Sequence, residues 1–386
     1  MDMDFVYLDY AATTPAAKEV VDAMIPFFAG AYGNPSSNHA LGSQAKEAVE
    51  DARAAVARFI GARPNEIFFN SGGSEANNTA VKGIAFANRR RGNHLIVSSI
   101  EHRSVLDACS FLEKEGFRVT CMPVNPFGTV DPDEVLKAIT KETILISIMH
   151  ANNEVGAIEP IAGISRIARA NRIYFHTDAV QTLGHIPVNV DDLGVDLLSA
   201  SAHKFYGPKG IGLLYVRTGV EMSSLIHGGS QEEDRRAGTE NVPGIIGFAK
   251  AVQVADRELV NDREKILRLD RMLRDGLAEI PGISFNGHPT ERLPGYVNIT
   301  VDSADGEALL FDLRLEGICA SNGSACDSSS TEPSHVLLAL GLPARAARNS
   351  LRFTLGRQTS DADIEKLLQV MPSSVNRCRK TYNPYL

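Results

Sequence analysis

Apolar residues recur along the chain at spacings that predict alternating helices and strands. Between Ser43 and Ile60 they recur every three or four positions while charged residues fill the other face, which predicts an amphipathic helix. Ser43 is expected to cap this helix and Gly61 to end it. Continuous apolar runs follow, and because polar residues do not alternate within them, they predict strands of a sheet that is covered on both faces.

Seven strand-like runs occur, and most of them are separated by helical segments. The strand-like runs are residues 66–70, 95–98, 118–122, 144–149, 173–177, 197–200 and 211–216. The helical segments between them are residues 74–90, 105–115, 133–139 and 164–170. This order predicts an α/β fold in which a mostly parallel sheet forms the middle of three layers.

The pattern changes after Pro243 and predicts a second, smaller α+β domain. A long charged helix is expected over residues 244–280, ended by Pro281. Three shorter helices and two strands follow it, at residues 307–315, 334–340, 362–370, 296–301 and 351–355. We therefore predict a large domain over residues 15–255 and a small domain made of residues 1–14 and 256–386.

Composition and charge exclude several classes of function. Of the 386 residues, 44% are hydrophobic and 22% charged, and the formal net charge of −8 argues against binding nucleic acid through a broad basic surface. No apolar run approaches the ~20 residues that cross a bilayer, and Asp2 and Asp4 argue against a secretory signal. The 5 cysteines lack the close spacing of a zinc site or disulfide framework, so we expect a cytoplasmic protein without a resident metal.

Polar clusters follow the predicted strands, at the sheet edge where ligands bind in open α/β folds. The first, Ser71-Gly72-Gly73-Ser74-Glu75, suits a phosphate, because small residues expose backbone N–H groups at the start of a helix. A plain helix cap is the alternative. The others are His150–Gly156, which also fits a polar turn, His176–Gln181 and Ser201–Lys204, with His102 beside them.

Two residues in these clusters carry specific chemistry. Asp178 follows a buried strand, where a carboxylate needs a partner such as a protonated pyridine nitrogen, although a helix cap or an ion pair would also satisfy it. Lys204 follows another strand and could serve as a Schiff-base amine, or could be a surface lysine. A phosphate cradle, an acid and an amine along one sheet edge together favour pyridoxal 5′-phosphate as the cofactor.

The sequence resembles the class V aminotransferases of pyridoxal-phosphate fold type I, and within them the NifS/IscS-type cysteine desulfurases. The resemblance covers essentially the whole chain. Besides the clusters above, it rests on Tyr7-Leu-Asp-Tyr-Ala-Ala-Thr-Thr-Pro15, Gly33-Asn-Pro-Ser-Ser37, Arg236-Ala-Gly-Thr-Glu-Asn241, Ser321-Asn-Gly-Ser-Ala-Cys326 and Ser350-Leu-Arg-Phe-Thr-Leu-Gly356.

The resemblance implies a role for each matching residue. Lys204 would carry the cofactor and move protons, His102 would assist, and Cys326, on a loop of the small domain, would accept the sulfur. Thr239 would reach the cofactor phosphate of a second subunit, which implies a homodimer. The implied cofactor contacts are Gly73, Ser74, Asn153, Asp178, Gln181, Ser201, His203, Lys204 and Thr239. The implied contacts of the substrate carboxylate are Asn34, Asn153 and Arg352.

The activity implied is conversion of L-cysteine to L-alanine, with a persulfide left on Cys326. The sulfur would pass to an iron–sulfur scaffold protein or another acceptor, and Cys326 would be a transient cluster ligand in such a complex. A selenocysteine lyase, another class V aminotransferase and a non-catalytic assembly scaffold are the alternatives. The ending Tyr382-Asn-Pro-Tyr-Leu386 lacks the long tail of IscS proteins and favours a NifS-like member. Cys319 lies in an apolar run and is expected to be structural, and the same is expected of Cys109 and Cys121.

Overall fold

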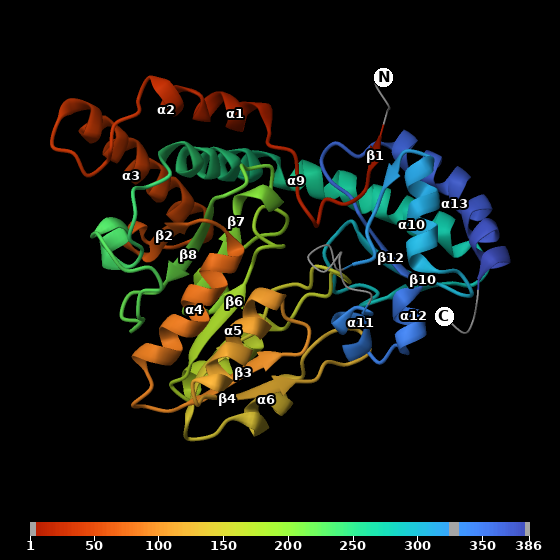
Figure 1. Ribbon diagram of the computed structural model, residues 1–386, viewed down its shortest axis with the longest axis horizontal. Coiled ribbons are helices and arrows are strands. Elements are labelled where there is room, and N and C mark those ends of the chain that lie inside the picture. The colour runs from red at the N-terminus through yellow and green to blue at the C-terminus, as the bar shows by residue number, and fades with distance from the viewer. Residues whose placement is uncertain (1–4, 324–331, 383–386) are drawn as a thin grey trace.

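The computed structural model describes residues 5–323 and 332–382, so Cys326 lies outside the described residues (Figure 1). Its strands are β1 (Val6–Tyr7), β2 (Ile67–Asn70), β3 (His94–Ser98), β4 (Arg118–Met122), β5 (Thr143–Ser147), β6 (Tyr174–Asp178), β7 (Leu197–Ser201), β8 (Gly212–Val216), β9 (Ile283–Asn286), β10 (Tyr296–Val301), β11 (Ile318–Cys319) and β12 (Ser350–Thr354). Its α-helices are α1 (Lys18–Met24), α2 (Pro26–Ala29), α3 (Ala40–Ile60), α4 (Gly73–Ala87), α5 (Arg103–Lys114), α6 (Pro132–Ala138), α7 (Ile161–Ala170), α8 (Val190–Leu193), α9 (Val242–Ala278), α10 (Gly306–Leu315), α11 (His335–Ala339), α12 (Ala344–Arg348) and α13 (Asp361–Thr381).

The main sheet has seven strands in the order β2-β8-β7-β6-β5-β3-β4, and β8 alone runs antiparallel to its neighbours. Helices α4 and α5 pack on one face, and α3, α6, α7 and the first part of α9 pack on the other. This arrangement confirms the predicted three-layer α/β fold with its seven strands. Strands β3, β5, β6 and β7 are parallel, so their carboxyl ends meet at one edge of the sheet.

A second core lies around the three-stranded antiparallel sheet β12-β10-β9. The last part of α9, together with α10 and α13, covers this sheet, and β1 pairs with β11 beside it (Figure 1). Along α9, buried residues up to Ala255 belong to the main core, and those from Ile266 onward belong to the second. We propose from this change of core that the two domains divide inside α9.

Helix α3 shows how local chemistry moved one predicted boundary. Its start is capped by His39, whose Nδ1 accepts a hydrogen bond from Gly42 N at 3.2 Å, and the expected cap at Ser43 is therefore wrong. A histidine nitrogen satisfies the free N–H groups of the first turn as a serine oxygen would. The end at Gly61 is confirmed, since this residue has a φ of 72°, which favours glycine.

Candidate active site

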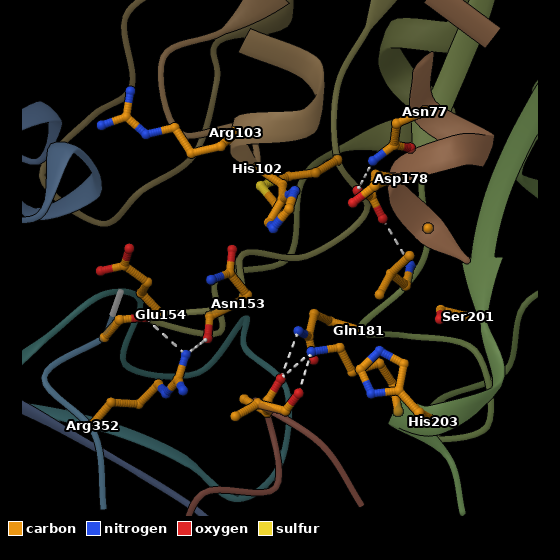
Figure 2. Close-up of a pocket in the computed structure, with 18 of the residues that line it drawn as sticks. Asn77, His102, Arg103, Asn153, Glu154, Asp178, Gln181, Ser201, His203 and Arg352 are labelled. Carbon is orange, nitrogen blue, oxygen red and sulfur yellow. Dashed lines mark hydrogen bonds between the residues drawn. The ribbon is translucent and has the colours of Figure 1, made fainter. Parts of the chain in front are cut away.

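A cavity of about 230 Å³ lies where the carboxyl ends of the parallel strands face the second core. The main sheet supplies most of its wall, and Arg352 closes it from β12 (Figure 2). The side chains and backbone that line it come from segments far apart in the sequence: Ala11, Ala12, Gly73, Ser74, Asn77, His102, Arg103, Met149, Asn153, Glu154, Asp178, Val180, Gln181, Ser201, His203, Lys204, Gly323, His335 and Arg352.

Asp178 ends β6 and is only 5% exposed, so its charge depends on nearby donors. Asn77 Nδ2 donates to Asp178 Oδ2 at 2.6 Å, and Val180 N donates to Oδ1 at 2.9 Å (Figure 2). The same Asn77 nitrogen lies 2.9 Å from Ser104 Oγ. The Asn77 amide thus links the acid at the end of β6 to the start of α5.

His102 caps α5 at the other end of this link. Ser104 N donates to His102 Nδ1 at 3.1 Å, and Ser104 Oγ lies 2.8 Å from the same nitrogen. Because a backbone N–H can only donate, Nδ1 is the acceptor, and we assign the proton of the neutral ring to Nε2. His102 lines the cavity with its protonation pattern already set by the helix cap.

Lys204 enters the cavity from the short helix that follows β7. Its Nζ donates to Ala11 O at 2.6 Å and to Ala12 O at 2.9 Å. Both carbonyl groups belong to the N-terminal segment, which crosses from the second core to the main sheet. The amine is therefore held at a defined position that faces Asp178 and Gln181 across the same cavity.

One end of the cavity suits a phosphate group. Helix α4 begins at Gly73, and its 15 residues direct the positive end of the helix dipole there. A Cβ at Gly73 would lie 2.7 Å from Val180 Cγ2, and Gly72 has a φ of 150°, so both positions favour glycine. Burial, and then the charge of Lys204, lower the pKa of His203 to about 4. His203 is thus neutral near pH 7, and Ser74 and Ser201 line the same end.

Gln181 follows β6 and is 7% exposed. Its Nε2 donates to Ala11 O at 3.2 Å, and its Oε1 accepts from the Tyr296 hydroxyl at 2.6 Å. Tyr296 is the first residue of β10, so a strand of the three-stranded sheet holds a residue that lines the cavity. Both ends of the Gln181 amide are therefore fixed before any ligand binds.

Arg352 is 1% exposed and ends the cavity opposite Asp178 (Figure 2). Its Nη2 donates to Asp9 Oδ1 at 2.7 Å, and its Nη1 donates to the backbone oxygens of Asn153 at 2.8 Å and Gly323 at 3.0 Å. A guanidinium is a group that suits a carboxylate through paired N–H donors. Asp9 offsets part of its charge.

Among residues 5–323 and 332–382, the site residues expected from the sequence line this cavity except Thr239, which was expected at the cavity of a second subunit, and Asn34. Thr239 lines a separate cavity together with Ser71 and Arg236. Asn34 lies in an exposed loop before α3, where its Oδ1 accepts from Ser36 N at 2.9 Å. Among the cysteines, Cys109 is buried as expected of a structural residue, whereas Cys121 is exposed on β4.

Sequence reasoning missed Asn77, Asp9 and Tyr296. Asn77 lies four residues after Gly73, so both are on the same face of α4. This spacing was the signal that could have identified Asn77 as a residue of the site. Asp9 lies inside the first motif of the family resemblance but was given no role there. Tyr296 lies in an apolar run, and nothing in that run distinguishes it from a core residue.

The fold and the cavity together define a pyridoxal-phosphate enzyme of fold type I. The residues fit this cofactor: a helix start with two glycines suits the phosphate, a buried carboxylate suits the ring N–H, and a lysine suits the Schiff base. Within residues 5–323 and 332–382, no helix has both the length and the apolar character needed to cross a membrane.

Comparison with known proteins agrees with this class. The model of the family "Aminotransferase class-V" matches residues 6–367. The chain is 54% identical over 381 residues to cysteine desulfurase IscS of Dictyoglomus turgidum, covering 98% of this chain and 96% of that protein. It is 53% identical to cysteine desulfurase IscS of Methanosarcina thermophila, covering 97% and 93%. A solved structure described as a NifS-like protein superposes with a TM-score of 0.91 at 36% identity, covering 97% of this chain and 100% of that one.

The chain belongs to the class V aminotransferase family. Its similarity to proteins named IscS and to a NifS-like structure confirms the narrower resemblance to NifS/IscS-type cysteine desulfurases.

Proposed function

We propose that this protein is a pyridoxal-phosphate-dependent cysteine desulfurase that converts L-cysteine to L-alanine and supplies sulfur for iron–sulfur cluster assembly. The observation that carries the proposal is a single cavity that holds Lys204, Asp178 and Arg352, in a chain that is 54% identical to a cysteine desulfurase. Lysine, carboxylate and guanidinium are the groups needed to attach an amino acid, activate it and orient its carboxylate.

The chain's own residues divide the work of binding. Gly73, Ser74, Ser201 and His203 would hold the phosphate, and Asp178 would accept a hydrogen bond from the ring nitrogen. His102 would lie against the ring and assist proton transfer. Gln181 would donate to the ring oxygen. When bound, pyridoxal phosphate supplies an electron sink that makes the Cα–H of an attached amino acid acidic.

Lys204 would remove the Cα proton of the substrate, with its amine kept in reach by the Ala11 and Ala12 carbonyl groups. Arg352 and Asn153 would hold the substrate carboxylate at the far end of the cavity. Cys326 would cleave the carbon–sulfur bond: its thiolate would attack the substrate sulfur, and the Cβ–S bond would break as an S–S bond forms. The carbon fragment would then take up one proton at Cβ and regain one at Cα to give alanine. The persulfide on Cys326 then carries the sulfur to an acceptor.

We further propose that two copies of the chain assemble into a homodimer. Thr239 lies away from the cavity of its own chain, and the cavity it lines shares Ser71 and Gly210 with the hollow around the phosphate end. These features support a contribution of Thr239 to the phosphate site of a second subunit. An iron–sulfur scaffold protein is the sulfur acceptor that this activity favours, and Cys326 would be the residue that contacts it.

The test is to load the purified protein with pyridoxal phosphate, add L-cysteine, and measure alanine, persulfide and sulfide. Formation of alanine with one added sulfur on the peptide containing Cys326 supports the proposal. Two results would contradict it: transfer of the amino group to a keto acid, which indicates an aminotransferase, or turnover of selenocysteine with none of cysteine, which indicates a selenocysteine lyase.

A further inference from the structure

Tyr296 stands at the point where the second core meets the cavity. It begins β10, yet its hydroxyl lies 2.6 Å from Gln181 Oε1 in the turn after β6. The residue is 6% exposed, and its backbone oxygen accepts from Arg274 Nη2 at 2.7 Å. A Cβ at Gly156 would lie 2.6 Å from Tyr296 Cβ, so the ring is seated directly against the Gly156 backbone.

The direction of each hydrogen bond around Gln181 follows from the atoms involved. Ala11 O can only accept, so the Gln181 atom that faces it is the amide nitrogen, at 3.2 Å. The amide oxygen therefore faces Tyr296, and the tyrosine must donate. Burial raises the pKa of Tyr296, so the hydroxyl keeps the proton that it donates.

This arrangement leaves one hydrogen of the Gln181 amide for the cavity. An amide nitrogen carries two hydrogens, and Ala11 O accepts only one of them from this residue. Gln181 lines the cavity, so the group that it presents there is an N–H donor. Without the tyrosine hydroxyl, the 3.2 Å bond to Ala11 O is the one hydrogen bond from the described part of the chain that would hold the amide in this orientation.

We infer that Tyr296 is a positioning residue that fixes the Gln181 amide as a donor toward the ring oxygen of the cofactor and so favours the deprotonated form of that oxygen. This inference rests on the proposed function, which places the cofactor ring beside Gln181. Under this inference, the first residue of β10 influences the protonation of a cofactor that the main sheet holds.

Other charged groups surround Gln181 and Tyr296, and they stay unchanged when the Tyr296 hydroxyl is removed. Asp9 and Arg352 act electrostatically on Tyr296, Lys204 shares the Ala11 carbonyl with Gln181, and Asp178 lies in the same cavity. A difference between wild type and Tyr296→Phe therefore reports the lost hydroxyl.

The experiment is a pH titration of the visible absorption of the loaded enzyme. In Tyr296→Phe the midpoint should rise by ~0.4 to 1.1 pH units, as expected when a typical hydrogen bond to a negatively charged form is weakened. Gln181→Ala should raise the midpoint as well, and adding Tyr296→Phe to Gln181→Ala should raise it no further. The matched control is Tyr215→Phe, because Tyr215 is also buried and its hydroxyl has no hydrogen-bond partner among the described residues.

The outcomes separate this inference from the proposed function. If Gln181→Ala shifts the midpoint but Tyr296→Phe does not, or if Tyr296→Phe shifts it equally with and without Gln181, the inference is overturned. If Gln181→Ala leaves the midpoint unchanged, Gln181 does not donate to the ring oxygen, and this part of the proposed function is contradicted together with the inference. Should Tyr296→Phe not fold, 3-fluorotyrosine at this position keeps the shape and strengthens the donor, so the midpoint should fall, and an unchanged midpoint overturns the inference.

Discussion

Replacing Asp178 by asparagine tests the electronic role of the buried carboxylate. The substitution keeps the size of the side chain. The asparagine oxygen can still accept from Val180 N, which in the wild type lies 2.9 Å from Asp178 Oδ1. The substitution removes the negative charge. It also points the new NH2 group at Asn77 Nδ2, which in the wild type donates to Asp178 Oδ2 at 2.6 Å. In the variant, two N–H donors would face each other. Asn77 can avoid this by turning its amide so that its Oδ1, which is buried and has no partner among the described residues, accepts from the new asparagine.

The magnitude follows from the bond that is lost to the ring nitrogen. A hydrogen bond to a charged group contributes ~1.5–3 kcal/mol, so the rate of alanine formation should fall roughly 10- to 150-fold. The protein should still bind pyridoxal phosphate, because the phosphate end and Lys204 are unchanged. Turning Asn77 also places its oxygen against Ser104 Oγ, and the serine can donate to that oxygen only by giving up its hydrogen bond to His102 Nδ1, so the loss should lie at the upper end of this range.

The assay is exchange of the cysteine Cα proton with solvent deuterium, measured beside alanine formation at saturating cofactor. The matched control is Asp196→Asn, because Asp196 Oδ2 accepts from Phe175 N at 2.9 Å at the other end of the same pair of strands, away from the cavity. Asp196→Asn should exchange at the wild-type rate. Wild-type exchange in Asp178→Asn would refute the proposed role of the carboxylate.

Three further predictions concern Lys204, Cys326 and Arg352. Lys204→Ala should abolish turnover and the borohydride-reducible link to the cofactor. A variant that still desulfurates cysteine at a comparable rate would contradict the role proposed for Lys204. Cys326→Ala should keep cofactor binding but lose sulfur transfer, whereas Cys319→Ala should keep both, and mass spectrometry that maps the added sulfur to Cys319 would contradict the mechanism. Arg352→Lys, which loses the two-pronged contact, should raise KM for cysteine ~10-fold or more with a smaller change in kcat; an unchanged KM would exclude a contact with the substrate carboxylate.

Local pattern was sufficient for most of the elements. The apolar runs predicted every strand of the main sheet, and most of these strands are buried along their whole length, as expected of a sheet that is covered on both faces. The end of α3 was equally readable, since a left-handed residue after a helix favours glycine, as at Gly61. The start was not, because His39 caps only when its ring reaches back to Gly42 N, which depends on the chain before the helix.

Some residues of the site could likewise be predicted from the sequence, whereas their arrangement could not. Asp178, Lys204 and Gly73 could be indicated from the sequence, because each follows a strand and the carboxyl ends of parallel strands share one edge. The order of the strands was not predicted, and it is this order that brings β3, β5, β6 and β7 together around one cavity.

Only the tertiary structure decided the contacts between distant segments. Asp9 and Arg352 are 343 residues apart, and Gln181 and Tyr296 are 115 apart. Hydrogen bonds of this kind leave no periodic trace in the sequence, because they depend on how segments far apart in the chain pack together. The sequence by itself determined the elements, the fold class and the chemistry available at the sheet edge. The packing of the second core against that edge determined how Gln181 is aimed and where Arg352 lies, because the Tyr296 hydroxyl holds the Gln181 amide and the Asn153 backbone oxygen accepts from Arg352 Nη1.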